Sequence, residues 1–361
     1  MLSESTVKSV RSLVRRFWGI PASGVMLQGE SCHVEDPTRE ETHGDVLHPC
    51  IRFIEEGFEG HHWWMVYTPY YGGNDMMENP RLCYSDAKEG EIPTRWAFYC
   101  QIAGRPVTGY NSDPTLLFHH GSLFVFFREN YTEAANKAGC SRVTRGCRVS
   151  QRRVTFFDDT LLTNVPRNID REVCPTFLAD ETAGFRAYTM HLRFCSRIMY
   201  SLPKRLANLT YSFLDLLSDF CIYSRFRCKG VGIWHSSELD KEFVYDGTVK
   251  FKGCSRFYHP WHMDLFQAVT EGGGKALFAV VLTDIKQGDI CLARSDDGMH
   301  FSFYRKPLVV SPYGMDRLYK PSAVVVDGTF LLFYTYLDKE DGVNKLLVSA
   351  DNWLDVLQRI S

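Results

Sequence analysis

Residues 111–127 read NSDPTLLFHHGSLFVFF, in which an acidic residue and a proline precede an alternating apolar strand, a turn and a second apolar strand. Four other stretches begin with a similar polar step, usually with a proline, ahead of an apolar strand: LHPCIRFI from Leu47, VCPTFLA from Val173, WHMDLFQAV from Trp261 and YKPSAVVV from Tyr319. The arrangement therefore recurs five times, and the polar residue changes each time.

Two more elements follow each of these starts in the same order. The second is an aromatic strand, as in HHWWMVYTPY or GTFLLFYTYL, and the third is an apolar strand that ends near a serine, as in RLCYSDAKEG or KLLVSADNW. The marker serines recur at steps of roughly 54 to 86 residues, which suffice for a four-stranded sheet with its loops; they are Ser85, Ser150, Ser236, Ser295 and Ser349. Hairpins alone would also fit a β-sandwich. Because the same three elements recur in the same order five times, the sequence predicts an all-β fold and, more specifically, a five-bladed β-propeller.

The composition is that of a globular protein with a large core. The chain has 361 residues, a formal net charge of −2, 45% hydrophobic and 14% aromatic residues. So small a charge gives no field that would recruit nucleic acid. No apolar run approaches the roughly 18 residues of a membrane span, and the N-terminus lacks the apolar core of a secretory signal. We therefore expect a soluble, cytoplasmic protein without a nucleic-acid partner or membrane insertion.

The 12 cysteines show neither CxxC pairs nor zinc-finger spacing. In a chain of this length we expect them to be small buried apolar residues rather than disulfides or metal ligands. We predict no metal site and no cofactor.

Two segments outside the repeat have the helical spacing of apolar residues. One includes Val7, Val10 and Val14, and the other, LPKRLANLTYSFLDLLSDFCIYSRF, lengthens the third repeat. We predict an N-terminal helix and lead-in segment over residues 1–43 and a propeller over residues 44–361, with a helical insertion in the third blade near residues 203–226. Both helices should pack on the propeller; the alternative is a homo-oligomer or protein partner at the inserted helix.

Polar residues at the strand starts form the candidate site. The first strand of each propeller blade lines the central axis, so these residues should meet in one pocket. Tyr70, in the loop TPYYGGNDMMENP, is a candidate platform for stacking on a sugar. The candidates at the strand starts are Asp45, His48, Asp113, Glu172, His259, His262, Asp264 and Lys320.

The chain resembles the five-bladed propeller glycosidases of the invertase-like and arabinanase-like superfamily. SDP at Asp113 matches the Asp-Pro step of their second blade, EVCP from Glu172 approximates the Glu-Cys-Pro motif of the third, and SDDGMHF at Ser295 is similar to a turn common in these propellers. The first blade has His48-Pro49 where the family has Asp-Pro, and EVCP holds one residue more than the family motif. A regular strand would turn Glu172 to the other face unless a bulge restores it.

The resemblance implies one carboxylate from each of the first three blades. Glycoside cleavage needs a carboxylic acid that protonates the leaving oxygen and a carboxylate on the opposite face that acts as nucleophile or base. The resemblance would assign Asp45 as base or nucleophile, Asp113 as sugar-orienting stabiliser and Glu172 as general acid. The substrate-binding residues would be His48, Tyr70, His259, His262, Asp264 and Lys320.

Structural alternatives exist for these residues. Asp113 could be a turn residue ahead of a proline, Glu172 a loop acid paired with an arginine, and His48 a hydrogen-bond partner of a neighbouring strand. Three functions fit the sequence: a glycoside hydrolase-like enzyme acting on a glycan or oligosaccharide, a propeller that binds a carbohydrate or protein without catalysis, and a subunit of a larger assembly. Likeness of fold does not choose among them.

Overall fold

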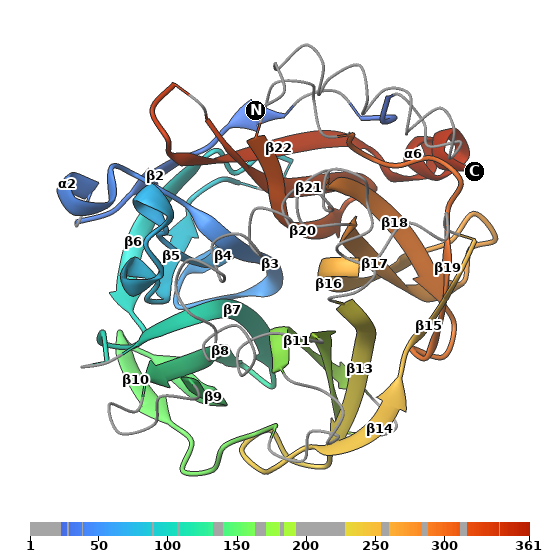
Figure 1. The fold of residues 1–361 in the computed structure, drawn as a ribbon. Helices are drawn as coiled ribbons and strands as arrows, with labels where there is room; N and C mark the ends of the chain where they lie inside the picture. The colour runs from blue at the N-terminus through green and yellow to red at the C-terminus, as the bar shows by residue number, and fades with distance from the viewer. Residues whose placement is uncertain are drawn as a thin grey trace, which may run out of the picture.

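The structure is a computed structural model that describes residues 23–26, 29–37, 39–88, 90–106, 109–132, 140–162, 171–180, 184–192, 228–253, 260–283, 288–310, 316–338 and 340–361. Its strands form five sheets, each of four or five strands. Figure 1 shows the sheets arranged around a common axis, so the predicted five-bladed propeller is confirmed.

The first two blades follow the predicted order of strands from the axis outward. Blade I consists of β3 (Leu47–Phe58), β4 (His61–Thr68), β5 (Arg81–Ser85) and β6 (Arg95–Gln101), with β2 (His33–Glu35) parallel to β6 at its edge. Blade II consists of β7 (Tyr110–His119), β8 (Ser122–Thr132), β9 (Cys140–Ser150) and β10 (Arg153–Phe156).

The remaining blades repeat this order. Blade III consists of β11 (Arg171–Asp180), β12 (Gly184–Leu192), β13 (Cys228–Ser236) and β14 (Val244–Thr248). Blade IV consists of β16 (Pro260–Val269), β17 (Lys275–Thr283), β18 (Asp289–Ser295) and β19 (His300–Phe303), with β15 (Lys250–Lys252) at its edge. Blade V consists of β20 (Asp316–Val326), β21 (Thr329–Leu337) and β22 (Asn344–Asn352), with β1 (Glu30–Ser31) at its edge.

The ring closes through the start of the chain. β1 pairs with β22, so a segment from the beginning of the sequence completes the last blade. β2 pairs with β6 in blade I. Residues ahead of Gly44 therefore take part in the sheets of the propeller.

Five hydrophobic clusters hold the blades together, one between each pair of neighbours. Side chains alternate along a strand, so adjacent residues face opposite neighbours. Trp63 packs toward blade V, whereas Trp64 packs toward blade II, and both are buried. This two-sided burial explains why the strands of the sequence are so rich in aromatic residues.

The described helical segments lie elsewhere in the chain than the two predicted helices. The predicted N-terminal helix and the predicted insertion near residues 203–226 lie outside the described residues. The described residues include one turn of helix, α2 (Arg39–Thr42), two 3-10 turns, η1 (Tyr71–Gly73) and η2 (Asp75–Met77), and a C-terminal helix, α6 (Trp353–Ile360).

The sequence pattern does not predict helix α6, because the stretch KLLVSADNW fits a strand and its last residues, Asn352 and Trp353, form the start of the helix. The Asn352 side chain accepts a hydrogen bond from Asp355 N and so caps the helix. Trp353, Val356 and Ile360 are buried against the cluster between blades IV and V.

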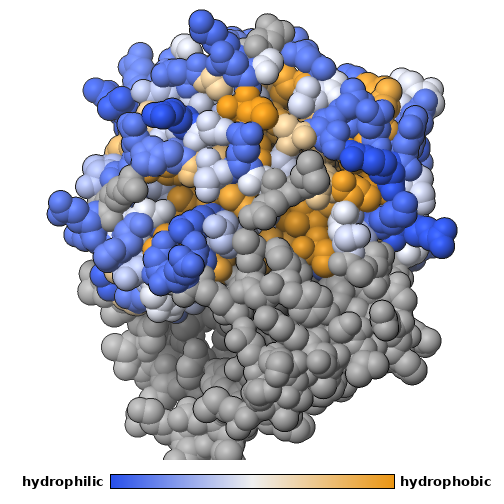
Figure 2. Space-filling model, turned by 90° about the horizontal axis from the view of Figure 1, so that it is seen from above, coloured by the Kyte–Doolittle hydropathy of each residue, from blue (hydrophilic) through white to orange (hydrophobic). Residues whose placement is uncertain are grey.

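Figure 2 shows the rim of the propeller from the side that carries β22 and α6, where most of the coloured surface is hydrophilic and a smaller apolar area lies between hydrophilic residues. Leu354 of α6 and Val269 of β16 are each 46% exposed. No helix in the described part of the chain is long and apolar enough to cross a membrane. Seven of the cysteines in that part are free, and six of these seven are buried.

A buried polar network fills the axis below the strand starts. Arg52 of β3 donates two hydrogen bonds to the Asp264 carboxylate of β16, at 2.7 and 2.8 Å, and Ser322 of β20 donates one at 2.6 Å. Asp264 is 1% exposed. Burial alone would raise the pKa of Asp264, but Arg52, Ser322 and Lys320 together outweigh burial and lower it. The ion pair joins blades I and IV at the centre of the ring, and the hydrogen bond from Ser322 adds blade V.

Replacing Asp264 with alanine is expected to lower the free energy of unfolding by about 3–5 kcal/mol, because the Arg52 guanidinium would stay buried without its partner. Urea denaturation followed by fluorescence measures the change. Glu129→Ala is the matched control, since Glu129 pairs with Arg145 at 2.8 Å but both side chains are partly exposed. It should cost less than about 1 kcal/mol. Equal losses in the two variants would contradict a central role for the axial ion pair.

Candidate functional site

Five side chains, one from the innermost strand of each blade, form a layer at the upper end of this network. They are His48 of β3, Asp113 of β7, Cys174 of β11, His262 of β16 and Lys320 of β20. All five are at most 4% exposed. We call this layer the hub. Its members come from positions up to 272 residues apart in the sequence, and the propeller alone brings them together.

The backbone ahead of the prolines turns these side chains to the axis. His48, Asp113 and Cys174 each precede a proline and each have a positive φ, of 52°, 53° and 55°. A residue before proline prefers an extended backbone, and a left-handed conformation costs a residue with a side chain of order 1–3 kcal/mol. The register of all five innermost strands shifts at the hub. Each strand therefore carries a bulge that re-aims one side chain.

Asp113 is the most highly connected member of the hub. Its Oδ2 lies 2.8 Å from Arg128 Nη2 and accepts from Cys174 N at 3.3 Å, and its Oδ1 lies 3.1 Å from His48 Nε2. Burial would raise the pKa of Asp113, but Arg128 and the other neighbouring groups, Lys320 among them, together outweigh burial and hold the pKa well below its usual range. Asp113 therefore carries a fixed negative charge at neutral pH.

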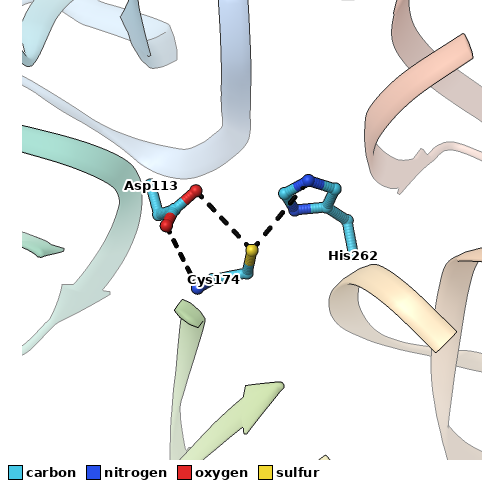
Figure 3. A group of neighbouring side chains, drawn as sticks. All are labelled: Asp113, Cys174 and His262. Atoms are coloured by element: carbon cyan, nitrogen blue, oxygen red, sulfur yellow. Dashed lines mark hydrogen bonds between the residues drawn. The ribbon is translucent and has the colours of Figure 1, made fainter. Parts of the chain in front are cut away.

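Cys174 lies between Asp113 and His262 (Figure 3). Its Sγ is 3.6 Å from Asp113 Oδ1 and 3.9 Å from His262 Nε2. Burial and the neighbouring Asp113 raise the pKa of the Cys174 thiol, so the thiol is protonated and is not an activated nucleophile.

The two imidazoles of the hub are neutral. Burial lowers the pKa of His48 to about 4 in spite of the nearby Asp113, and burial together with His48 lowers the pKa of His262. Thr68 Oγ1 lies 3.1 Å from His48 Nδ1 and fixes the orientation of that ring. The fifth member, Lys320, donates from Nζ to the carbonyl oxygen of Pro114 at 2.6 Å and so ties blade V to blade II.

Glu78 adds a second carboxyl group next to the hub. It is 5% exposed, and its Oε2 lies 3.8 Å from His48 Nδ1 with no hydrogen-bond partner among the described residues. Burial and the negative charge of Asp113 raise the pKa of Glu78 well above its usual value. Glu78 is therefore protonated under conditions in which Asp113 is ionised.

A pocket of about 330 Å³ opens above the hub. Hub residues and Glu78 form its polar part, and aromatic side chains form much of its wall. The aromatic residues are Tyr70, Tyr110, Trp261 and Tyr319. The volume lies within the range of small-molecule sites, and the mixture of a few polar groups with aromatic rings is typical of them.

The acids singled out in the sequence have different surroundings. Asp113 is in the hub. Asp45 is buried but does not line the pocket; its Oδ2 accepts from Asn344 N and Nδ2 at 2.8 Å, and its Oδ1 accepts from Tyr70 N at 2.7 Å. The bulge that Glu172 needed exists, between Val173 and Thr176, but it turns Cys174 to the hub, and Glu172 is half-buried outside the pocket lining.

The predicted binding residues divide into three groups. His48, His262 and Tyr70 line the pocket. Lys320 is in the hub and Asp264 lies one layer deeper, in the ion pair with Arg52. His259 lies outside the described residues.

Three residues of the site were not predicted. The sequence does not single out Cys174, because Glu172, two positions ahead of it, fits the family motif better. Glu78 belongs to the tripeptide ENP, which fits a strand start or an acid at the edge of the pocket, and the sequence does not choose between them because the burial of Glu78 depends on the neighbouring blade. No local pattern in the sequence marks Arg128 as a site residue. It reaches Asp113 because β7 and β8 pair in a register that places Arg128 opposite Ser112.

Comparisons with known proteins agree on the fold. No family model matches the chain, and no curated protein matches it. An N-acetylgalactosamine deacetylase from F. plautii, solved with blood group B trisaccharide, superimposes with a TM-score of 0.64 at 14% identity, over 94% of this chain and 98% of that one.

Glycosidases of the same architecture superimpose as well. The GH43 β-xylosidase/α-arabinofuranosidase CoXyl43 from a compost metagenome, solved with xylotriose, gives a TM-score of 0.56 at 13% identity, over 90% of this chain and 94% of that one. An α-L-arabinofuranosidase from Lactobacillus brevis gives 0.54 at 9% identity, over 86% and 91%. The chain therefore has the five-bladed propeller fold of the GH43-type glycosidases, as the resemblance predicted, and its function must be argued from its own site.

Proposed function

We propose that the protein is a carbohydrate-active hydrolase that binds a small glycan unit in the axial pocket. One observation carries the proposal: hub side chains from four blades form the floor of a pocket that has aromatic walls, and the fifth blade adds Tyr319 and Asn344 to its lining. Buried polar groups of this kind are costly unless a bound molecule or another residue uses them.

The shape and chemistry of the pocket support a sugar. Tyrosine and tryptophan offer an apolar face for the C–H groups of a sugar ring and a polar edge for its hydroxyls. Tyr70 and Trp261 supply such faces, and His48 and Glu78 supply polar groups at the floor. Two structures of the same fold were solved with oligosaccharides, blood group B trisaccharide and xylotriose, in agreement with a glycan substrate.

The two carboxyl groups at the floor support hydrolysis. Hydrolysis of a glycan needs one group that gives a proton to the leaving atom, and carboxyl pairs with pKa values pushed apart are typical of such sites. Glu78 has a raised pKa and serves as the proton donor in this proposal. Asp113 has a lowered pKa and provides the fixed negative charge that stabilises positive charge developing on the sugar.

A carbohydrate-binding protein without catalysis is the second candidate, and a specific observation favours it. Both oxygens of Asp113 are already engaged, by Arg128 and Cys174 N on one side and by His48 on the other. The hub positions of blades I and III hold an imidazole and a thiol, which replace carboxylates poorly beside an oxocarbenium-like centre.

Turnover and binding on a panel of oligosaccharides and acylated sugars would distinguish these functions. We expect Glu78→Gln to lower kcat by roughly 10²–10⁴-fold, the usual contribution of a general acid, while the Kd for the substrate stays within a few-fold. Calorimetry with the same sugar gives the Kd.

Glu172→Gln and Asp45→Asn are the comparison variants, because the family resemblance would make those residues the acid and the base. A loss of turnover in Glu172→Gln with full activity in Glu78→Gln would contradict the role of Glu78. Binding of a sugar without turnover by the unaltered protein would establish the second candidate, and neither binding nor turnover on a broad panel would refute both.

The protonation of Glu78 has a separate consequence for stability. In the unfolded chain Glu78 ionises near its ordinary pKa of 4.5, whereas in the folded chain its pKa is raised. Its contribution to stability is therefore complete below about pH 4.5 and is lost as the pH rises toward the folded-state pKa. Glu78→Gln has no such loss, so the variant should gain stability relative to the unaltered protein as the pH rises, by up to about 1.4 kcal/mol per pH unit. Denaturation of both proteins at pH 4, 5, 6 and 7 measures the difference, and a difference that does not change with pH would show that Glu78 is ionised in the folded protein.

A further inference from the structure

We infer that the hub binds a divalent metal ion of the zinc type between Asp113 Oδ1, Cys174 Sγ and His262 Nε2. The three side chains come from blades II, III and IV and point toward one another, as Figure 3 shows. The sequence predicted no metal, because no two of these residues are close in the chain. The inference rests on the side chains alone and does not require the proposed glycan.

The distances suit a shared ion better than direct hydrogen bonds. The three donor atoms all lie within 4.8 Å of one another. With Zn–S near 2.3 Å and Zn–N or Zn–O near 2.0 Å, tetrahedral coordination separates the sulfur from each lighter donor by about 3.5 Å. The observed separations from Cys174 Sγ are 3.6 Å to Asp113 Oδ1 and 3.9 Å to His262 Nε2. A shift of a few tenths of an ångström would bring both separations from the sulfur to this value.

The donor set indicates the kind of ion. A thiolate and an imidazole together favour zinc over magnesium or calcium, which prefer oxygen ligands alone. Arg128 and Lys320 make the surroundings positive, so an ion here needs anionic ligands. The carboxylate of Asp113 and the thiolate that Cys174 becomes on binding supply two negative charges.

The residues around the three donors hold them in place. Arg128 and Cys174 N fix Oδ2 of Asp113 and leave Oδ1 facing Cys174 Sγ and His48. Both Asp113 and Cys174 have a left-handed backbone that aims their side chains at each other. Strained backbone conformations of this kind are common at ligand-binding sites, where contacts with the surrounding structure offset their unfavourable free energy.

His262 provides an independent observation. Its side chain is fully buried and packed on the ring of Tyr319, with centroids 4.6 Å apart. Its Nδ1 has no hydrogen-bond partner among the described residues, and its Nε2 faces only the weak sulfur contact. A buried imidazole with so few partners is explained by a ligand that the protein alone does not supply.

One coordination position remains open to the pocket. Asp113, Cys174 and His262 all line it, and three protein ligands with a fourth position for water or substrate are the arrangement of catalytic rather than structural zinc. The ion would therefore touch whatever molecule occupies the pocket.

Metal titration of the full chain tests the inference. The protein is treated with a chelator, desalted, and titrated separately with Zn²⁺ and Co²⁺, and the retained metal is measured by mass spectrometry. We expect one ion per chain and, for cobalt, the near-ultraviolet charge-transfer band of a thiolate ligand. Cys174→Ser should abolish that band, and His262→Gln should weaken binding by at least the roughly 10–100-fold that loss of an outer-sphere partner costs.

Cys147→Ser is the control, because Cys147 is also free and buried but packs between blades I and II. Circular dichroism of each metal-free variant shows whether it has folded, and the serine in place of Cys174 is nearly the same size. No retained metal in the unaltered protein, or a cobalt band that survives in Cys174→Ser, would overturn the inference. Glycan turnover by a chain that binds no metal would overturn this inference alone, whereas metal binding without any glycan binding or turnover would overturn only the proposed function.

Discussion

The structure depends on the conformation of the residues that precede the prolines of the innermost strands. His48, Asp113 and Cys174 adopt a left-handed backbone at positions where a bulge interrupts the pairing with the second strand. Regular strands would divide their side chains between the two faces of each blade, toward the hydrophobic clusters. The bulges instead direct one polar side chain per blade to the axis, so the fold stores local strain where the site is formed.

The charged side chains at the axis form two layers, of which the deeper one stabilises the fold and the upper one lines the pocket. The deeper layer pairs Asp264 with Arg52 and satisfies both, so it closes the axis and joins three blades. The upper layer is less completely satisfied, since Glu78 and His262 each keep an atom without a hydrogen-bond partner in the described part of the chain. Incomplete pairing in the layer that opens to the pocket, beside complete pairing below it, is typical of a site that receives a ligand.

Much of the architecture could be predicted from the sequence because each blade repeats the same local pattern. The polar step, the aromatic strand and the strand near a serine are each recognisable within a stretch of about 10 residues. In all five blades these three elements form the strands that the pattern predicts. Asp113 could be placed at the axis for the same reason. The sequence does not show whether Glu172 or Cys174 points to the axis. The answer depends on the residue at which the bulge begins, because a shift of one residue turns each side chain of a strand to the opposite face of the sheet.

Contacts between different blades could not be predicted from the sequence. Glu78 follows a loop of blade I, and its raised pKa depends on Asp113 of blade II. Arg128 meets Asp113 only because β7 and β8 pair in one register. Helix α6 was hidden by a strand pattern that runs into its capping asparagine.

The most direct test of this account is a crystal structure that resolves the side chains of the hub. The account predicts a left-handed backbone at His48, Asp113 and Cys174, with the Cys174 sulfur facing the axis between Asp113 and His262. An extended backbone at Cys174, with its side chain in the cluster between two blades and Glu172 turned to the axis, would contradict it.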